Sequence, residues 1–493
     1  MVTIGQWRGT ATRPWVVAIA LVVLALVLRA HEFGNPVIHV DEQYYLLVGD
    51  RLRSGHLPYI DLWDRKPIGL FLIYAATRLI PGEGIVAYQV AATLFAAATA
   101  MLVARGAREL DARPVAAFAA GAAYLIWLPL LSGGGGQSPV FYNLFIAGAA
   151  NLTLRLPVLA TQKRRAAIVI NGALSCLLAG LAIQTKYTPA IEGAFFGVAH
   201  LWFLRRSGAT WLTLLAAALL WLSLGLAPTA AAVAYYAAKG PSALDAFWFA
   251  NFASILLRGH YSYPATRIVG RLAGISAQLA LFALGAGMTL RKRPRRDVTW
   301  IAFGWLLAAF GGFVVLGTFF DHYALPLLAP LIILAAPSLG RHPRLLLLTL
   351  GAGMTLLVVE GLRESDDAPG ARAVAAVVAA NSHGSCPYVF TGDSITYYLA
   401  GTCVPTRYAF PSTLAYAPEK GATGVDEAEE VRRILATRPA VLVASTVPLA
   451  EWNQASRAEF FASVRRNYRP IFSAPRDYYR IVVYLRDDKQ PAK

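Results

Sequence analysis

Charged residues are scarce in this chain of 493 residues, and acidic ones are the scarcest. Asp and Glu number 28 against 45 Lys and Arg, and the four types together make up only 15% of the sequence. Hydrophobic residues reach 57%, and the mean hydropathy is +0.50. A soluble globular protein of this length is far less apolar. The composition therefore predicts a polytopic membrane protein, with membrane lipids around it.

Cysteine is also rare, with three residues in the whole chain. Cys176 lies in an apolar run and is interpreted as a small core residue. Cys386 and Cys403 lie in the polar C-terminal part, where a single disulfide can join them if that part faces an oxidising compartment. That part contains no Gly-rich phosphate loop, no metal-ligand spacing and no nucleophile motif, so it shows no chemistry of its own.

The net charge of +17 does not indicate nucleic acid as a partner, because the basic residues form short clusters between apolar runs. Such clusters mark the cytoplasmic loops of membrane proteins. They are Arg8 and Arg13; Arg105, Arg108 and Arg113; Lys163, Arg164 and Arg165; Arg205 and Arg206; residues 291–296; and Arg341 and Arg344. The N-terminus is therefore predicted to be cytoplasmic.

About eleven apolar runs are long enough, or nearly so, to cross a bilayer, which takes about 20 residues with some tolerance for tilt. They cover residues 14–30, 84–104, 115–132, 139–160, 166–183, 187–204, 210–236, 271–290, 298–317, 323–338 and 344–360. No small-residue cleavage pattern follows the first run, so it is predicted to be a retained span. The alternation places the loops 31–66, 132–138, 237–270 and 319–323, the turn near Lys186 and everything after residue 360 on the non-cytoplasmic face.

Two shorter segments lie in the first outer loop, which covers residues 31–80. Residues 67–80 are apolar but too few to span, and they are predicted to form a juxtamembrane or re-entrant helix that begins at Pro67. Residues 41–53 carry Tyr45, Val48 and Leu52 on one side, which predicts a helix lying on the membrane surface.

The composition changes to that of a soluble domain after residue 362. Helical patterns at residues 371–380, 426–436 and 456–466 alternate with β-rich runs at 388–391, 440–444 and 479–485. The predicted organisation is thus a transmembrane domain over residues 1–362 and an α/β periplasmic domain over residues 363–493.

The segment 35–69 combines Asp41, Glu42, Asp61 and Asp64 in a loop between apolar runs. A connection between two membrane helices does not need four acids, so this loop is predicted to be the active site. The alternative is that these acids cap helices: Asp41 its own helix, and Asp61 and Asp64 the helix that begins at Pro67. Capping is the preferred interpretation for Asp61 only.

Glycosyl transfer from a phosphate-linked donor needs a carboxylate to receive the acceptor's proton and a cation for the departing phosphate. Asp41 is predicted to be the base, with Glu42 in a supporting role. Asp64 is predicted to orient the acceptor or to bind a divalent metal ion through its oxygens. Lys186 lies at a span end, where a lysine taken by itself is interpreted as snorkelling to the interface; facing a cavity, it would instead bind the phosphate of a lipid carrier.

Other candidates are predicted to contact substrate, namely Tyr45, Arg65, Lys66, His322 and Tyr323. A histidine at a helix start is often incidental, so the last pair has a structural alternative. The loop 237–270 also carries cationic and aromatic residues that suit either donor phosphate or an ordinary interfacial belt. These are Arg258, His260, Tyr261, Tyr263 and Arg267.

With these residues in view, the chain resembles the membrane glycosyltransferases of the C-type fold. The branch that it resembles is the bacterial branch of the dolichyl-phosphate-mannose protein mannosyltransferase superfamily, which includes the lipid A aminoarabinose transferases. The resemblance rests on VDEQYYLLVGDRL (40–52), DLWDRKPIGLFLIY (61–74), GLAIQTKYTPA (180–190) and DHYALPLLAPLIILAA (321–336).

The resemblance implies a C-type fold of about eleven transmembrane helices with juxtamembrane helices in the first outer loop. It also implies transfer of a sugar from a polyprenyl-phosphate donor to a lipid, glycan or protein acceptor on the periplasmic face of a bacterial inner membrane. Carried over by position, Asp41 resembles the catalytic acid, Asp64 the second acid and Lys186 the carrier-phosphate lysine. Tyr44 stands where the aminoarabinose enzymes have an arginine, so the identity of the substrate does not carry over.

Two other classes of function remain as alternatives. A transporter or flippase of lipid-linked saccharide is expected to show ionisable or broken-helix features near mid-membrane and symmetry between its halves, and the sequence shows neither. A non-catalytic membrane scaffold would bind a partner through the C-terminal domain. Replacement of Asp41 distinguishes the two hypotheses. Loss of product with normal membrane insertion supports the enzyme, and an unchanged phenotype supports the scaffold.

Overall fold

The computed structural model of the chain describes residues 14–257, 263–363 and 366–492. The chain divides into two compact units, each of which is described by itself. The helical unit consists of Met1–Phe33, Gln89–Ala232 and Tyr263–Leu362. The mixed unit consists of Gly34–Tyr88, Val233–Ser262 and Arg363–Lys493. The mixed unit thus joins most of the first outer loop and part of the loop 237–270 to the C-terminal part.

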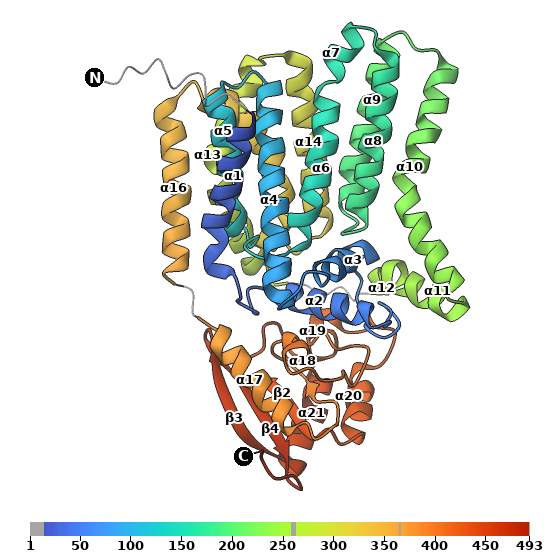
Figure 1. The fold of residues 1–493 in the computed structure, drawn as a ribbon, viewed down its shortest axis with the longest axis vertical. Coiled ribbons are helices and arrows are strands. Elements are labelled where there is room, and N and C mark those ends of the chain that lie inside the picture. Colours follow the sequence, from blue (N-terminus) through green and yellow to red (C-terminus); the bar gives the residue numbers. More distant parts are fainter. Residues whose placement is uncertain (1–13, 258–262, 364–365, 493) are drawn as a thin grey trace. The chain divides into compact units, whose positions relative to one another are not determined.

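Every apolar run predicted to span is helical (Figure 1). The corresponding helices are α1 (Pro14–Arg29), α4 (Gly84–Glu109), α5 (Pro114–Leu130), α6 (Ser138–Leu154) with α7 (Leu156–Thr161), α8 (Arg165–Ile183), α9 (Pro189–Arg206), α10 (Trp211–Ala238), α13 (Ala265–Lys292), α14 (Arg296–Val315), α15 (Leu325–Leu339) and α16 (Pro343–Gly361). Among the described residues, eight helical segments are long and apolar enough to cross a membrane. This supports the predicted multi-pass membrane protein.

Three of the eleven predicted spans fall short of that standard for reasons visible in the sequence. The helices α5 and α15 have only 17 and 15 residues. The helix α9 has 18 residues, but it carries Glu192 in its first turn and Arg205 and Arg206 in its last. Several helices begin with proline at their first positions, including α5, α9 and α16, where the missing N–H has no partner to lose.

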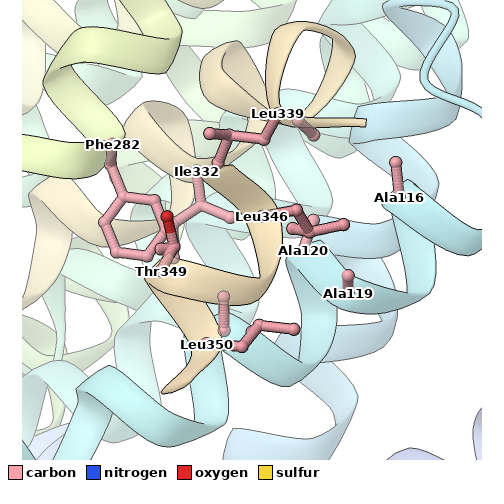
Figure 2. Close-up of a pocket in the computed structure, with 11 residues that line it drawn as sticks. Ala116, Ala119, Ala120, Phe282, Ile332, Leu339, Leu346, Thr349 and Leu350 are labelled. Carbon is pink, nitrogen blue, oxygen red and sulfur yellow. The ribbon is translucent and has the colours of Figure 1, made fainter. Parts of the chain in front are cut away.

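A closely packed seam lies between α5, α13, α15 and α16 in the helical unit. Alanines of α5 face Ile332 and Leu339 of α15 and Leu346 and Leu350 of α16 (Figure 2). The cavity that these residues line has a volume of about 10 Å³. A space of that size holds about one water molecule at most, so the seam is a packing contact.

Arg29, at the end of α1, fixes the Gly-rich loop of the helical unit. Its side chain is 2% exposed. Its guanidinium donates to the carbonyl oxygens of Gly133 at 2.7 Å and Gly135 at 2.6 Å, and to Thr93 Oγ1 at 3.1 Å. A buried arginine is tolerated here because carbonyl and hydroxyl acceptors satisfy its donors.

In the mixed unit, the predicted helices of the first outer loop are α2 (Val40–Arg53) and α3 (Ile68–Thr77). The prediction that residues 41–53 lie on a membrane surface through one side needs correction, because all residues from Glu42 to Gly49 are buried. The helix packs against α3 and against α18 (Ile395–Leu399). The spacing of Tyr45, Val48 and Leu52 indicates one buried side of the helix. It does not show that polar neighbours such as Gln43 are buried as well.

The segment 237–270, predicted to be a long loop, is mostly helical in its described part. It contains α11 (Pro241–Trp248), a π-helical stretch η3 (Phe249–Ala253) and α12 (Ser254–Leu257). Gly240, with φ of 112°, makes the turn before Pro241. Of the candidate residues in this segment, Arg258, His260 and Tyr261 lie outside the described residues. Arg267 belongs to α13, and Tyr263 precedes it.

The C-terminal part of the mixed unit is an α/β domain, as predicted. The predicted helices are α17 (Ala368–Asn381), α20 (Glu427–Ala436) and α21 (Gln454–Asn467), and the predicted strands are β1 (Tyr388–Val389), β2 (Val441–Ser445) and β4 (Tyr479–Arg486). The sheet order is β1-β2-β4-β3, with β1 and β2 parallel and the other pairs antiparallel. Figure 1 shows α17 beside the hairpin of β3 and β4, against which it packs.

The strand β3 (Tyr468–Arg476) was not predicted from the sequence. It contains Pro470 and Pro475 and lies at the edge of the sheet, where a strand tolerates proline. Its register shifts between Pro470 and Phe472, which breaks the alternation that a strand prediction relies on.

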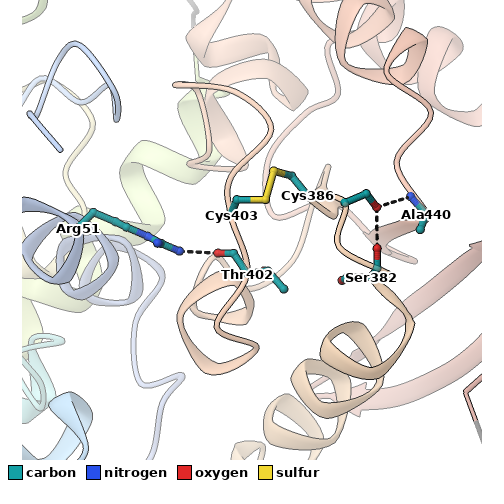
Figure 3. Close-up of a disulfide and its surroundings, with 7 residues drawn as sticks. Arg51, Ser382, Cys386, Thr402, Cys403 and Ala440 are labelled. Atoms are coloured by element: carbon teal, nitrogen blue, oxygen red, sulfur yellow. Dashed lines mark hydrogen bonds between the residues drawn. A yellow bond between two sulfur atoms is a disulfide. The ribbon is translucent and has the colours of Figure 1, made fainter. Parts of the chain in front are cut away.

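Cys386 and Cys403 form a disulfide, which the sequence had left open, and it closes a segment around β1 and α18 (Figure 3).

Candidate active site

The first turn of α2 carries two of the predicted catalytic acids, Asp41 and Glu42. The residue before the helix, His39, has an extended backbone and makes no side-chain cap. Neither acid is therefore the N-cap of α2, which removes the capping alternative for Asp41. Both lie where the free N–H groups of a helix favour negative charge. Asp41 is partly exposed, whereas Glu42 is fully buried.

The helix α3 lies close against α2 and brings a tyrosine to both acids. A Cβ atom at Gly49 would lie 2.7 Å from Tyr74 Cβ, so glycine is required for this approach. Burial raises the pKa of the Tyr74 phenol well above its usual value, and the charges of Glu42 and Asp41 raise it further. Tyr74 therefore stays neutral beside two carboxylates. The sequence did not indicate a role for Tyr74, because in the sequence Tyr74 looks like one more apolar residue of a short helix.

Asp64 lies in the turn before α3. Its Oδ1 accepts hydrogen bonds from the backbone N–H of Arg65 at 2.5 Å and of Lys66 at 3.0 Å. The N-cap of α3 is Pro67, without a side-chain cap, so Asp64 does not cap that helix. Asp61 does not cap it either, because its Oδ2 accepts from Leu57 N at 2.7 Å within the loop. The prediction that Asp61 caps the helix beginning at Pro67 is therefore wrong, because Asp61 bonds to the backbone N–H of Leu57 instead.

Asp64 and Asp41 are close enough to affect each other's ionisation. Burial raises the pKa of Asp64, and the negative charge of Asp41 raises it further. The charge of Lys66 and the two backbone N–H donors act in the opposite direction. Two carboxylates from separate parts of the loop thus share one electrostatic environment.

The two cations of the loop have different roles. Arg65 Nη2 lies 2.5 Å from Glu419 Oε2, and its guanidinium lies 5.0 Å from the ring centroid of Trp63. Lys66 Nζ lies 5.5 Å from the ring centroid of Tyr45. Arg65 is therefore committed to the C-terminal domain, and Lys66 is the cation that acts on Asp64. Glu419 gave no signal in the sequence, because its partner is 354 residues away.

Replacing Lys66 with methionine is expected to move the acidic limb of the pH–rate profile to higher pH. Burial already raises the pKa of Asp64, and removal of the lysine charge takes away an influence that lowers it. Asp64 will then be protonated at a higher pH, and transfer that needs its ionised form will fall at a higher pH. The measurement is kcat/KM against pH in membranes. Lys489→Met, in the C-terminal tail, is the control, and identical limbs in both variants would contradict the assignment.

In the helical unit, Lys186 lies between α8 and α9. Its Nζ is 4.0 Å from the ring centroid of Tyr323, which is a close cation–π contact. The side chain is partly exposed. The structure thus brings together two of the predicted substrate residues, which are 137 positions apart by subtraction of their numbers.

The turn that carries Tyr323 is an aromatic cluster. Tyr323 lies in the short helix η4 (Asp321–Tyr323), next to His322, with 4.5 Å between their ring centroids. The His322 ring stacks on Phe320 at 5.8 Å. His322 is therefore a stacking member of the turn that presents Tyr323 to Lys186.

Arg271, in the second turn of α13, holds this aromatic turn from the other side. Its Nη1 donates to the carbonyl oxygen of Thr318 at 2.6 Å, and its guanidinium lies 3.9 Å from the ring centroid of Phe320. Sequence reasoning named Arg267 and missed Arg271. The available signal was an arginine inside the first turns of an apolar span, which is costly unless the side chain has a partner.

Replacing Arg271 with alanine is expected to raise the donor KM about tenfold, because a charge-assisted hydrogen bond contributes about 1.5–3 kcal/mol. The variant loosens the turn that positions Tyr323 and Lys186, so donor binding suffers first. Arg291→Ala removes an exposed arginine at the other end of the same helix and is the matched control. Equal donor KM values in the two variants would show that Arg271 does not position the turn.

No group of three or more His, Cys, Asp and Glu side chains is arranged to hold a metal ion within the described part of the chain. Asp41 and Asp64 supply two carboxylates, and Asp64 already accepts two backbone hydrogen bonds. This donor set does not match the six or more oxygen ligands of Ca²⁺ or the octahedral shell of Mg²⁺. The divalent ion at Asp64 stays a prediction, and no step below depends on it.

A wider groove of about 490 Å³ lies in the helical unit between α7 and the start of α14. Two of its ionic residues are engaged elsewhere: Arg295 donates to the Glu109 carbonyl at 2.9 Å, and Asp297 pairs with Arg206 at 2.7 Å. It contains none of the predicted catalytic or substrate-binding residues. The candidate residues therefore form two sets, each described within its own unit: the acids of α2 with Asp64 and Lys66 in the mixed unit, and Lys186 with the aromatic turn in the helical unit.

Two solved structures of ArnT from Cupriavidus metallidurans are similar to this chain. The structure bound to undecaprenyl phosphate has 15% sequence identity and a TM-score of 0.62, and the match covers 95% of this chain and 98% of that one. The structure of the apo state has 14% identity and a TM-score of 0.59, with 95% and 97% covered. No protein-family model and no curated protein matches the chain. The chain therefore has the fold of ArnT, the C-type fold of membrane glycosyltransferases that its sequence motifs predicted.

Proposed function

We propose that this chain is a membrane glycosyltransferase that moves a sugar from a polyprenyl-phosphate donor to a hydroxyl group of a lipid, glycan or protein on the periplasmic face. The observation that carries the proposal is the packing of α2 against α3, which sets Asp41 in the first turn of α2 and Asp64 in the turn before α3. It brings two carboxylates together in the first outer loop of a chain with the fold of ArnT, which was solved with undecaprenyl phosphate bound.

Asp41 is the better base of the two. It is partly exposed and therefore open to an acceptor, and it stands at the start of a helix whose other faces are buried. In the proposed step Asp41 takes the proton of the acceptor hydroxyl as the oxygen attacks the anomeric carbon. Asp64, held rigidly by two backbone N–H groups, orients the same acceptor. Glu42, fully buried beside Tyr74, supports the local charge balance.

The bond from the anomeric carbon to the phosphate oxygen breaks in the same step, and polyprenyl phosphate departs with an additional negative charge. Lys186 is the proposed partner of that phosphate. Its ammonium lies over the face of Tyr323, which supports the cation electrostatically at the place where a phosphate would need a positive charge. Direct attack on the face opposite the leaving phosphate inverts the anomeric configuration.

The test is transfer of radiolabelled sugar from a panel of polyprenyl-phosphate sugars to membranes that contain the protein or lack it. Transfer that depends on the protein, with inverted configuration in the product, is the expected result, and the donor that works identifies the sugar. Retained configuration would overturn the direct attack. No transfer from any donor by a correctly inserted protein would overturn the enzyme and favour a transporter or a scaffold.

A further inference from the structure

Gln43, the residue directly after the two acids of α2, is bound at both ends of its side-chain amide. It is 1% exposed. Its Nε2 donates to Asp393 Oδ1 at 3.0 Å, and its Oε1 accepts from the backbone N–H of Ile395 at 3.4 Å. A buried amide with both groups satisfied by one turn is held in a single orientation.

The turn that receives Gln43 lies at the carboxyl end of β1, where the chain passes through Gly392 into α18. The carboxyl ends of parallel strands are where α/β domains usually bind ligands. Here the turn is fixed to the neighbouring strand, because Ser445 N donates to Thr391 Oγ1 at 2.9 Å. The edge of the sheet that would take a ligand is filled by a side chain from α2.

Asp393 is in turn held by Arg476, at the end of β3. Arg476 Nε lies 3.4 Å from Asp393 Oδ2, and the same guanidinium pairs with Asp367. It also donates to the carbonyl oxygen of Val37 at 2.8 Å, in the segment that leads into α2. Asp393 is only 5% exposed, and Arg476 places a cation beside this buried side chain.

The other end of α2 is bound to the same part of the domain. Arg51, in the last turn of α2, donates to the carbonyl oxygen of Thr402, next to Cys403 (Figure 3). The disulfide from Cys403 to Cys386 closes the segment 386–403, which contains β1, the turn with Asp393, and α18. This closed segment therefore contacts α2 at both its first and its last turn.

We propose that the segment 386–403 is a clamp that positions the catalytic helix, with Gln43, Asp393 and Arg476 as positioning residues for Asp41. The proposal rests on the proposed function. The C-terminal domain has no catalytic motif, and the proposal gives it a role. The domain sets the direction in which the first turn of α2 presents its acids. A rotation of α2 by part of a turn would move Asp41 away from an acceptor while the fold stays intact.

The test replaces the group of Gln43 that donates a hydrogen bond to Asp393 with a group that accepts one. Gln43→Glu places a carboxylate against Asp393, and we expect kcat to fall about tenfold or more with a smaller change in donor KM, because two buried carboxylates repel. Adding Asp393→Asn supplies an amide donor for the new carboxylate. The double variant is expected to recover to within about threefold of wild type, a recovery that a general loss of stability would not produce. Gln454→Glu, at the exposed start of α21, is the matched control.

Additive losses in the double variant, or wild-type kcat in Gln43→Glu, would overturn the clamp. Amide hydrogen exchange of residues 40–53 in the purified full chain supplies a readout that does not need activity. Exchange is expected to be faster in Gln43→Glu and to return toward wild type in the double variant. If the wild-type protein transfers no sugar, the proposed function fails, and this exchange pattern alone decides whether the clamp holds α2. Unchanged exchange in Gln43→Glu would then reject it.

Discussion

Replacing Asp41 with asparagine is expected to lower kcat for sugar transfer by about 10²–10⁴-fold, the range that a positioned general base contributes. Asparagine keeps the shape and the place at the start of α2 but accepts no proton. The donor KM is expected to change little, because Asp41 acts on the acceptor. The measurement is initial transfer rate in membranes against donor concentration, with the amount of inserted protein matched.

Asp61→Asn is the matched control for this variant. Asp61 belongs to the same loop and is exposed, and its hydrogen bond from Leu57 N can be kept by an asparagine oxygen. Near wild-type transfer in Asp61→Asn alongside loss in Asp41→Asn would locate the effect at one carboxylate. Equal rates in wild type and Asp41→Asn would show that Asp41 is not the base and would favour the hypothesis of a non-catalytic scaffold.

Removing the charge of Lys186 is the second large change. Lys186→Met is expected to reduce kcat about 10²–10³-fold, the effect of deleting one preorganised group that stabilises charge developing in a transition state. Methionine keeps the long apolar stem against Tyr323 but cannot stabilise a departing phosphate. Binding of polyprenyl phosphate itself is expected to weaken as well, because the product carries the charge that Lys186 faces.

Two variants separate this role from a structural one. Tyr323→Phe keeps the ring face under the ammonium, so it should lose little activity if the cation–π contact is what the ring supplies. Lys239→Met removes a lysine that also lies over a tyrosine, 5.4 Å from the ring centroid of Tyr235. If Lys239→Met and Lys186→Met behaved alike, the lysine at 186 would be an interfacial anchor.

The helices of the apolar runs and three of the four strands followed from local pattern, whereas the helices α11 and α12 did not. Apolar runs near the length of a bilayer are helical in all eleven predicted places, since backbone groups in lipid must bond within their own segment. The sequence offered Cys386 and Cys403 as a possible pair, and the structure decided that they are joined. The exceptions are informative: β3 escaped prediction through its two prolines and its register shift.

The sequence by itself determined the class of protein, the loop that holds the acids and the residues Asp41, Asp64 and Lys186 as candidates, because composition and spacing are properties of neighbouring residues. Only the tertiary structure decided which of these meet and what each cation does. Arg65 is paired with Glu419, Lys66 acts on Asp64, and Gln43 is bound by Asp393. Glu419 and Asp393 lie more than 300 residues from their partners in the first outer loop, and a periodic pattern in one segment carries no information about the segment that it will contact.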